Sequence, residues 1–178
     1  MLPRCLTPFA LAGLIALASC AAGSSHLEGQ VSMTAITFAR GAVLGNRIAN
    51  DTAVGRGTLS RARADCVEAY QDKKYPQAFQ QLLDDALTAG EMRASDDFWS
   101  SEAGRKWAEQ VLRRLTRAIG SALPGTEVQL SKEETQQVED FKASSAGRKI
   151  VGEKLMLSSA ALTASMSVVL ESRRACPS

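Results

Sequence analysis

The stretch DFWSSEAGRKW, Asp97–Trp107, indicates how this chain folds, because nearly the same sequence occurs twice in the chain. Forty-three residues later the sequence reads DFKASSAGRKI, Asp140–Ile150. Self-similarity at a fixed spacing indicates one structural unit used more than once. Repeat units are therefore predicted at about residues 88–120 and 131–173. A duplicated structural unit is favoured over the alternative, a binding face that both copies share.

Each unit is predicted to open with a capped helix. Thr88 and Ser131 stand at the two starts, and each is followed three residues later by a glutamate, Glu91 or Glu134. This spacing is a capping box, in which a hydroxyl and a carboxylate each accept a hydrogen bond from a backbone amide that the helix leaves unpaired.

A second helix is predicted to follow within each unit. An aromatic residue is followed by a serine, which suits an N-cap, and then by a glycine in the first turn. The missing side chain of that glycine would let the turn pack closely against a neighbour. The structural residues of the repeat are Phe98, Ser101, Gly104, Phe141, Ser144 and Gly147.

The rest of the chain also favours helices, so residues 31–178 are predicted to form one compact, all-α, single-domain helical bundle. A first helix is expected over residues 32–49, a loop over 50–58, a second helix capped by Thr58, and a third starting at Pro76 after the break DKKYP.

The C-terminal helix is expected at about residues 146–173 and contains a run of sixteen residues without charge. A helix that is apolar on most faces is typical of the buried centre of a bundle. The alternative is a membrane-spanning helix, but the run is shorter than the roughly 20 residues that a span needs.

The N-terminus resembles the leader of a bacterial lipoprotein. An apolar run after Arg4 ends in Leu17-Ala18-Ser19-Cys20, which is similar to a lipobox. The resemblance implies removal of residues 1–19, acylation of Cys20 by diacylglycerol and an N-acyl chain such as palmitate, and a flexible tether over residues 20–30. Ala21 follows where an inner-membrane protein would usually carry Asp, which implies the outer membrane, facing the periplasm. The alternative is an ordinary signal peptide with a chance cysteine.

Two cysteines remain in the exported chain once Cys5 leaves with the leader and Cys20 takes lipid. An even pair in an oxidising compartment predicts a disulfide between Cys66 and Cys176. The alternative is a pair of free thiols.

Residues of about 60–170 resemble a family of bacterial envelope proteins, the domain-of-unknown-function-2059 family. The hallmark is a capped acidic helix followed by Phe-aromatic-x-Ser-Pro-x-Gly-x-Lys. The matching residues are Phe98, Trp99, Ser101, Gly104 and Lys106 in the first copy and Phe141, Ser144, Gly147 and Lys149 in the second. Both copies lack the proline, and Lys142 replaces the second aromatic. The resemblance implies an all-α periplasmic domain and brings no activity with it.

The sequence offers little for catalysis, and no catalytic residue, metal site or cofactor is expected. The single histidine, His26, lies in the tether, so a Ser-His or Cys-His nucleophile is not expected. Adjacent carboxylates such as Asp96 and Asp97 point in different directions on a helix, which does not suit the facing pair of a glycosidase. Their place late in a helix is electrostatically unfavourable, so either Arg93 compensates them or they have a function.

Binding is therefore the favoured function. The chain has 21 Lys+Arg against 19 Asp+Glu, and this near balance argues against a nucleic-acid partner. The candidate partner-binding residues are Trp99, Arg105, Lys106, Arg113 and Arg117. They would form a basic surface for an acidic protein or anionic headgroups, with Trp99 as the anchor, although a solvated helix face is the simpler interpretation.

The leading hypothesis is a non-catalytic outer-membrane lipoprotein that binds a protein partner, for example an immunity protein against a toxin that acts in the envelope. The first alternative is an envelope-maintenance protein that binds peptidoglycan or an assembly machine. The second is a hydrolase that uses Asp97 and Asp140 on envelope polymers.

Overall fold

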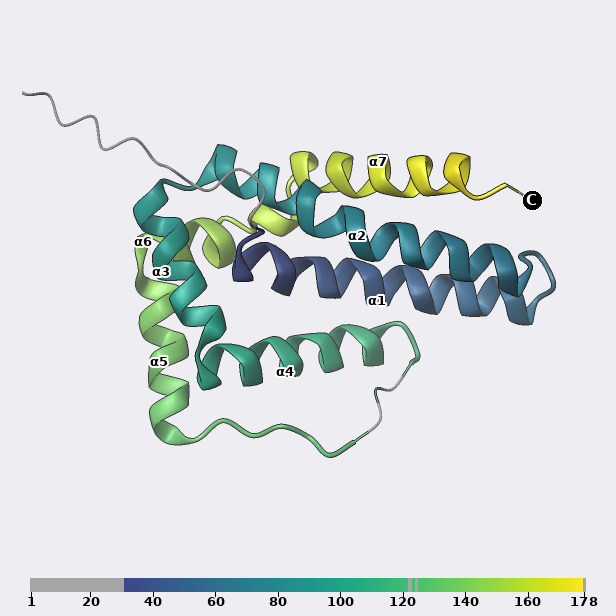
Figure 1. The fold of residues 1–178 in the computed structure, drawn as a ribbon. Helices are drawn as coiled ribbons and strands as arrows, with labels where there is room; N and C mark the ends of the chain where they lie inside the picture. The colour runs from purple at the N-terminus through teal and green to yellow at the C-terminus, as the bar shows by residue number, and fades with distance from the viewer. Residues whose placement is uncertain (1–30, 122, 124, 178) are drawn as a thin grey trace, which may run out of the picture.

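The computed structural model describes residues 31–121, 123 and 125–177, and every regular element in this part of the chain is helical (Figure 1). The all-α prediction is confirmed. The predicted leader, Cys20 and the tether lie outside the described residues. The elements run α1 (Met33–Gly55), α2 (Arg61–Ala86), α3 (Ala89–Ser100), α4 (Glu102–Ala118), α5 (Lys132–Ala143), α6 (Ser145–Gly147), a π-helical turn η1 (Arg148–Gly152), a 3-10 turn η2 (Leu155–Leu157) and α7 (Ser159–Ala175).

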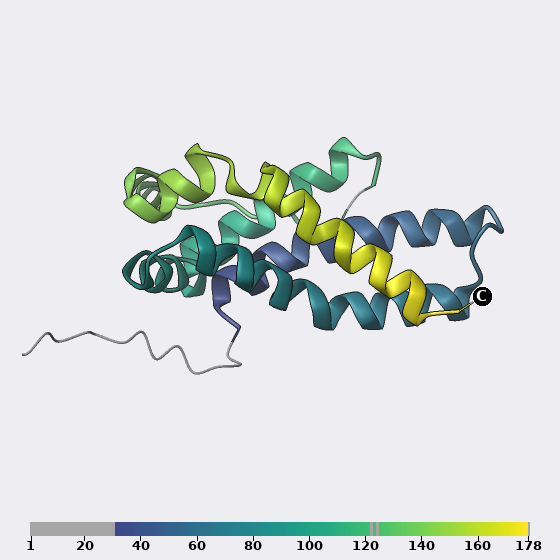
Figure 2. The same cartoon turned by 90° about the horizontal axis from the view of Figure 1, so that it is seen from above.

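Two long helices form the frame of the molecule. α1 and α2 pack side by side as an antiparallel hairpin, α7 crosses them obliquely, and α4 runs along α1 (Figures 1 and 2). The short helices α3 and α5 stand across one end of this frame (Figure 1). The core lies where the two groups meet, and its larger buried side chains are Tyr75, Phe79, Leu82, Leu83, Leu87, Met92, Trp99, Phe141 and Ile150.

The first helix extends further than the sequence predicted. α1 continues to Gly55, so most of the loop expected over residues 50–58 is helical. The next helix is capped by the hydroxyl of Ser60, and the prediction that Thr58 is its cap is wrong. The Thr58 hydroxyl instead donates to the carbonyl of Ala53, which helps to close the end of α1.

Pro76 does not begin a helix but lies inside α2. The predicted break at DKKYP is therefore wrong. Proline removes one backbone hydrogen bond and disfavours a helix interior, but its neighbours are anchored on both sides. Tyr75 and Phe79 are buried and stack with ring centroids 5.9 Å apart. Tertiary packing of this face therefore outweighs the local preference of the proline.

Both predicted capping boxes are present. The Thr88 and Ser131 hydroxyls accept from the N–H groups of Glu91 and Glu134, and each carboxylate accepts in return from the amide of its capping residue. Ser101 and Ser144 then cap the following helices, as predicted, by accepting from the third residue on.

The second copy departs from the first after its glycine. The first copy continues as the regular helix α4, whereas the second passes through η1, Lys154 and η2 before α7 begins. Lys154 has φ 54°, which is left-handed backbone. The single helix predicted over residues 146–173 is therefore wrong. Its expected burial is also wrong, because Leu157 is 72 % and Met166 63 % exposed.

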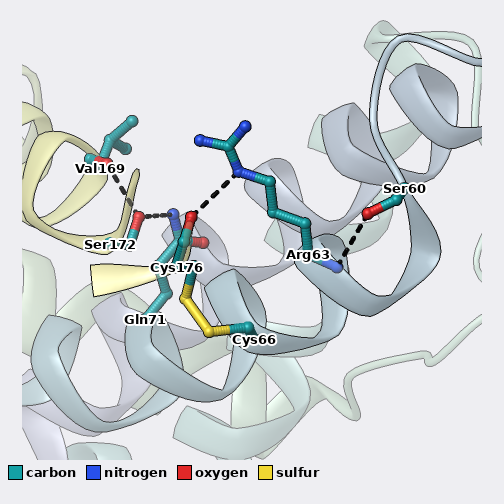
Figure 3. Close-up of a disulfide and its surroundings, with 7 residues drawn as sticks. All are labelled: Ser60, Arg63, Cys66, Gln71, Val169, Ser172 and Cys176. Atoms are coloured by element: carbon teal, nitrogen blue, oxygen red, sulfur yellow. Dashed lines mark hydrogen bonds between the residues drawn. A yellow bond between two sulfur atoms is a disulfide. The ribbon is translucent and has the colours of Figure 1, made fainter. Parts of the chain in front are cut away.

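A disulfide joins Cys66 on α2 to Cys176 after α7, which confirms the predicted pairing (Figure 3). Neighbouring bonds hold the same two segments together. Arg63 donates to the carbonyl of Cys176 at 3.1 Å, and Gln71 donates to the Ser172 hydroxyl at 3.2 Å (Figure 3). The C-terminal end of α7 is thus attached to the first half of the chain.

Among the described residues, no single helix is both long and apolar enough to cross a membrane. One bent pair, Ser145–Leu157 with Ser159–Ala175, has the necessary length and composition together, with a 51° bend between its parts.

Candidate functional site

The two repeat units face each other across a pair of stacked aromatic rings. The Phe98 and Phe141 ring centroids are 3.9 Å apart and their planes differ by 2°. These residues occupy equivalent positions in the two copies, so the repeat brings its own hallmark residues together. The duplication therefore forms an interface inside the molecule.

The interface is closed by two reciprocal ion pairs. Lys149 of the second copy binds Glu91 of the first at 2.7 Å, and Lys106 of the first binds Glu134 of the second at 2.6 Å. Each glutamate is also the acidic residue of its capping box. The last part of each motif thus contacts the first part of the other copy.

The ion pairs shift the pKa values of the carboxylates and of Lys106. The Lys149 ammonium, with help from the Ser145 hydroxyl and the Thr88 amide, lowers the pKa of Glu91 from 4.5 to about 2. A hydrogen bond from Lys106 likewise lowers the pKa of Glu134, and the bond to Glu134 raises the pKa of Lys106. Glu91 and Glu134 are therefore fixed, ionised structural groups at neutral pH.

Each repeat glycine packs against the aromatic residue of its own copy. A Cβ on Gly104 would collide with the Phe98 carbonyl and would lie 2.9 Å from the Trp99 Cα. A Cβ on Gly147 would collide in the same way with the Phe141 carbonyl. Each carbonyl also accepts a hydrogen bond from the capping serine, at 2.6 Å. The glycines are therefore needed for a tight helix–cap–helix corner, as the repeat predicted.

The predicted basic surface is largely neutralised by the protein itself. Lys106 binds Glu102 as well as Glu134, and Arg117 binds Glu127 at 3.0 Å. Arg113 binds Glu109 and also donates to backbone carbonyls of the segment after α4. Arg105 donates to the carbonyl of Ser100. Only part of this positive charge therefore faces outward to attract an acidic partner.

Trp99 is a core residue and not an exposed anchor, which corrects its predicted role. Only 4 % of the residue is exposed. Its ring stacks on Trp107 with centroids 5.2 Å apart and meets Phe38 and Phe141 edge-on. The reason is the repeat, which directs the aromatic pair of the first copy inward toward the second.

An apolar cleft of about 460 Å³ opens between α1, α4 and the η2–α7 segment. Such a volume lies within the usual range of ligand sites. α1 contributes small residues to it, and Trp99 and Phe79 lie at its inner side. No charged side chain lines it, and its lining residues include Phe38, Gly41, Ala42, Val111, Leu112 and Leu115.

The elements around the cleft also carry exposed apolar side chains. Leu115 of α4 and Ile119 at the C-cap of α4 are 56 % and 58 % exposed, and Leu157 of η2 and Met166 of α7 are more exposed still. Contiguous apolar surface with polar edges marks a place where another molecule binds. We call these side chains, together with the cleft, the α1–α4–α7 groove.

The sequence contains a signal for this groove in two of its helices. α4 has a narrow apolar stripe, and α7 has an apolar run without charge. Both patterns are typical of core helices. Burial depends, however, on which helices lie opposite, and each of these two helices leaves large apolar side chains exposed.

The carboxylates considered for catalysis have structural partners or stand apart. Asp96 accepts from the backbone N–H and the hydroxyl of Thr34, at 2.8 and 2.6 Å. Asp96 therefore caps the first turn of α1. The backbone N–H of Thr34, and not Arg93, offsets the unfavourable position of the Asp96 carboxylate late in its own helix. Asp140 accepts from Gln136 on its own helix. Within the described residues, no three His, Cys, Asp or Glu side chains form a group that could hold a metal ion.

No protein-family model, curated protein or solved structure matches this chain. The lipobox and the resemblance to the envelope family therefore stay predictions.

Proposed function

We propose that this chain is a non-catalytic, lipid-anchored protein of the bacterial outer membrane whose helical domain binds a protein partner in the periplasm. One specific form of this function is an immunity protein that neutralises a toxin acting in the envelope. The location rests on the lipobox-like segment ending at Cys20. Attachment there would hold the domain at the membrane surface where such a toxin arrives.

The observation that carries the binding function is the exposed α1–α4–α7 groove. A stable bundle would bury Leu115, Leu157 and Met166, yet each of these residues is more than half exposed. The groove has neither charged lining residues nor a cluster of metal-ligating side chains in the described part of the chain. Those properties suit recognition and offer nothing to a reaction.

Affinity capture tests this proposal. The purified protein, with the Cys66–Cys176 disulfide formed, is immobilised, incubated with envelope and secreted fractions, and washed in high and low salt. We expect one stoichiometric protein that survives high salt, because apolar contacts are not screened.

Two results would contradict the proposal. Retention of purified peptidoglycan sacculi without any protein would favour an envelope-maintenance role. Hydrolysis of an envelope polymer that is lost on Asp97→Asn or Asp140→Asn would favour an enzyme.

A further inference from the structure

We propose that the outer face of α7 rests on an anionic lipid bilayer, the membrane to which the chain is anchored. This face consists of Leu162, Met166 and Leu170, which we call the α7 stripe, followed by Arg173 and Arg174. The inference rests on the lipid anchor of the proposed function and goes beyond it, because contact through α7 would fix how the domain is oriented on the membrane.

The α7 stripe is an exposed apolar surface along one side of the helix. Leu162, Met166 and Leu170 are spaced by four residues and therefore lie on one face. They are 58 %, 63 % and 48 % exposed, whereas the buried residues of α7, such as Val168, point to the other side. None of the three stripe residues lines the cleft beside α4. The stripe is thus separate from the cleft, and Figure 2 shows α7 lying across the outside of α1 and α2.

Positive charge follows the stripe on the same helix. Arg173 and Arg174 come three and four residues after Leu170, so both lie beside the C-terminal end of the stripe. Both are exposed, and neither has a hydrogen bond or an ion pair among the described residues. The neighbouring carboxylate, Glu171, is turned toward α2, where it accepts from the Tyr70 hydroxyl at 3.0 Å. The two arginines are therefore available to anionic headgroups.

The predicted anchor would keep this surface close to a bilayer. The described chain begins at Val31, eleven positions after Cys20. Even a fully extended chain of this length spans at most about 40 Å. α7, with 17 residues, is itself about 26 Å long. Because the tether is short, the local concentration of the bilayer is high, and even a weak contact would be occupied.

The size and composition of the stripe favour a bilayer over a second protein. A stable protein–protein interface takes about 20–30 residues from each side, whereas the stripe has three large apolar side chains. A helix at a membrane surface inserts its apolar side chains below the headgroups and keeps its arginines at headgroup level. Ser145–Leu157 with Ser159–Ala175 also has the apolar composition of a membrane segment.

Methionine oxidation tests whether lipid covers the stripe. The purified full chain is bound to vesicles of phosphatidylcholine alone or mixed equally with phosphatidylglycerol. Hydrogen peroxide then oxidises accessible methionines to sulfoxides, and mass spectrometry gives the rate at each one. We expect Met166 to be oxidised at least about fivefold more slowly on the anionic vesicles, because lipid would cover its sulfur. Met33, which is 38 % exposed and lies next to the tether, is the control within the same molecule and should keep its rate.

Charge variants test the contribution of the two arginines. Arg173→Glu with Arg174→Glu should abolish the protection of Met166 on anionic vesicles. The control is Arg93→Glu with Arg114→Glu, which changes the net charge equally at two exposed arginines on α3 and α4 that also have no ion pair among the described residues. This control should keep the protection.

Leucine variants test the apolar contact. Leu170→Gln should reduce the protection of Met166, whereas Leu115→Gln, at a similarly exposed leucine of α4, should not. Each protein is scored by the ratio of its Met166 oxidation rates on the two kinds of vesicle, so that a change in local exposure cancels. Thermal melts verify that each variant folds.

Several results would overturn the inference: equal Met166 rates on both kinds of vesicle, equal protection of Met33 and Met166, or equal loss of protection in the two charge variants. Protection of Met166 only after a captured protein is added would instead assign the stripe to that protein. Intact mass spectrometry of the chain isolated from membranes tests the anchor separately. A chain without lipid contradicts the proposed function, whereas a lipidated chain with an unprotected Met166 contradicts this inference alone.

Discussion

At the scale of single residues, Gly104 and Gly147 are positions where the backbone leaves no room for a side chain. Both glycines have ordinary helical surroundings in the sequence, but each lies against a carbonyl of its own preceding helix. That carbonyl cannot move freely, because it also accepts from the capping serine. A methyl group at either position therefore requires the corner to open.

We expect Gly104→Ala and Gly147→Ala each to destabilise the protein by at least about 2 kcal/mol, the usual range for overpacking. The control is Gly45→Ala, where a Cβ would meet nothing within 4 Å. That substitution should stabilise α1 by roughly 0.5–1 kcal/mol through helix propensity. Urea unfolding measures all three, and equal effects at Gly45 and Gly104 would contradict the packing explanation.

Asp96 and Asp97 are neighbours with different environments. Asp96 accepts two hydrogen bonds from Thr34 at the start of α1, as an N-terminal cap would. Asp96→Ala should therefore lower the free energy of unfolding by about 1–2 kcal/mol, as loss of a cap does. Asp97→Ala should change it by less than about 0.5 kcal/mol, as expected for a surface position. Chemical denaturation of the two variants side by side checks this difference, and a larger loss in Asp97→Ala would show that the cap is not the important bond.

At the scale of elements, the two helix–cap–helix units stabilise each other through their capping boxes. Glu91 is held by its own helix and by Lys149 of the other unit, and Glu134 is held in the same way by Lys106. A local motif thus becomes a tertiary contact. This arrangement gives a physical reason for the chain to keep both copies of one sequence.

Stability should fall in acid because of Glu91. Its pKa is lowered from 4.5 to about 2 in the folded protein, so its contribution is fully present above the unfolded value and is lost as the pH falls from about 4.5 toward 2. Glu91→Gln keeps the capping box but removes the charge. We expect this variant to lose less stability than the wild type between these pH values.

The control for this pH prediction is Glu153→Gln, at an exposed carboxylate with no hydrogen bond or ion pair in the described structure. Its acid sensitivity should match that of the wild type. Urea unfolding curves across the pH range give the comparison. If the free energy of unfolding of Glu91→Gln fell with pH in parallel with that of the wild type, the Glu91–Lys149 ion pair would not be the cause of the acid sensitivity.

At the scale of the whole molecule, the disulfide fixes the far end of a helix that buries few side chains. α7 buries only Ala161, Val168 and Ser172, and it exposes Leu162, Met166 and Leu170. Cys66 and Cys176 are 110 positions apart in the sequence, so the bond closes a long loop. The disulfide therefore holds the end of α7 against α2.

Cys66→Ser with Cys176→Ser should destabilise the protein by about 2–5 kcal/mol, the usual result of removing a disulfide that closes a long loop. Local opening should be greatest in α7, which hydrogen exchange measures peptide by peptide. Reduced wild-type protein serves as the comparison and should match the double variant. An unchanged unfolding midpoint and unchanged exchange in α7 would show that packing alone holds this helix.

The sequence by itself determined the helical class, both capping boxes, the capping serines, the need for Gly104 and Gly147, and the cysteine pair. These features depend on backbone groups a few residues apart, or on the two cysteines that lie outside the predicted leader and lipobox, so the sequence is sufficient to predict them. Only the tertiary structure decided that α2 continues through Pro76, that Trp99 is buried and that Lys106 and Lys149 bind the opposite copy. It also decided that apolar residues of α4 and η2 line an open cleft and that apolar residues of α7 are exposed. An apolar stripe shows which face of a helix avoids water, but whether that face is covered depends on elements that lie far away in the chain.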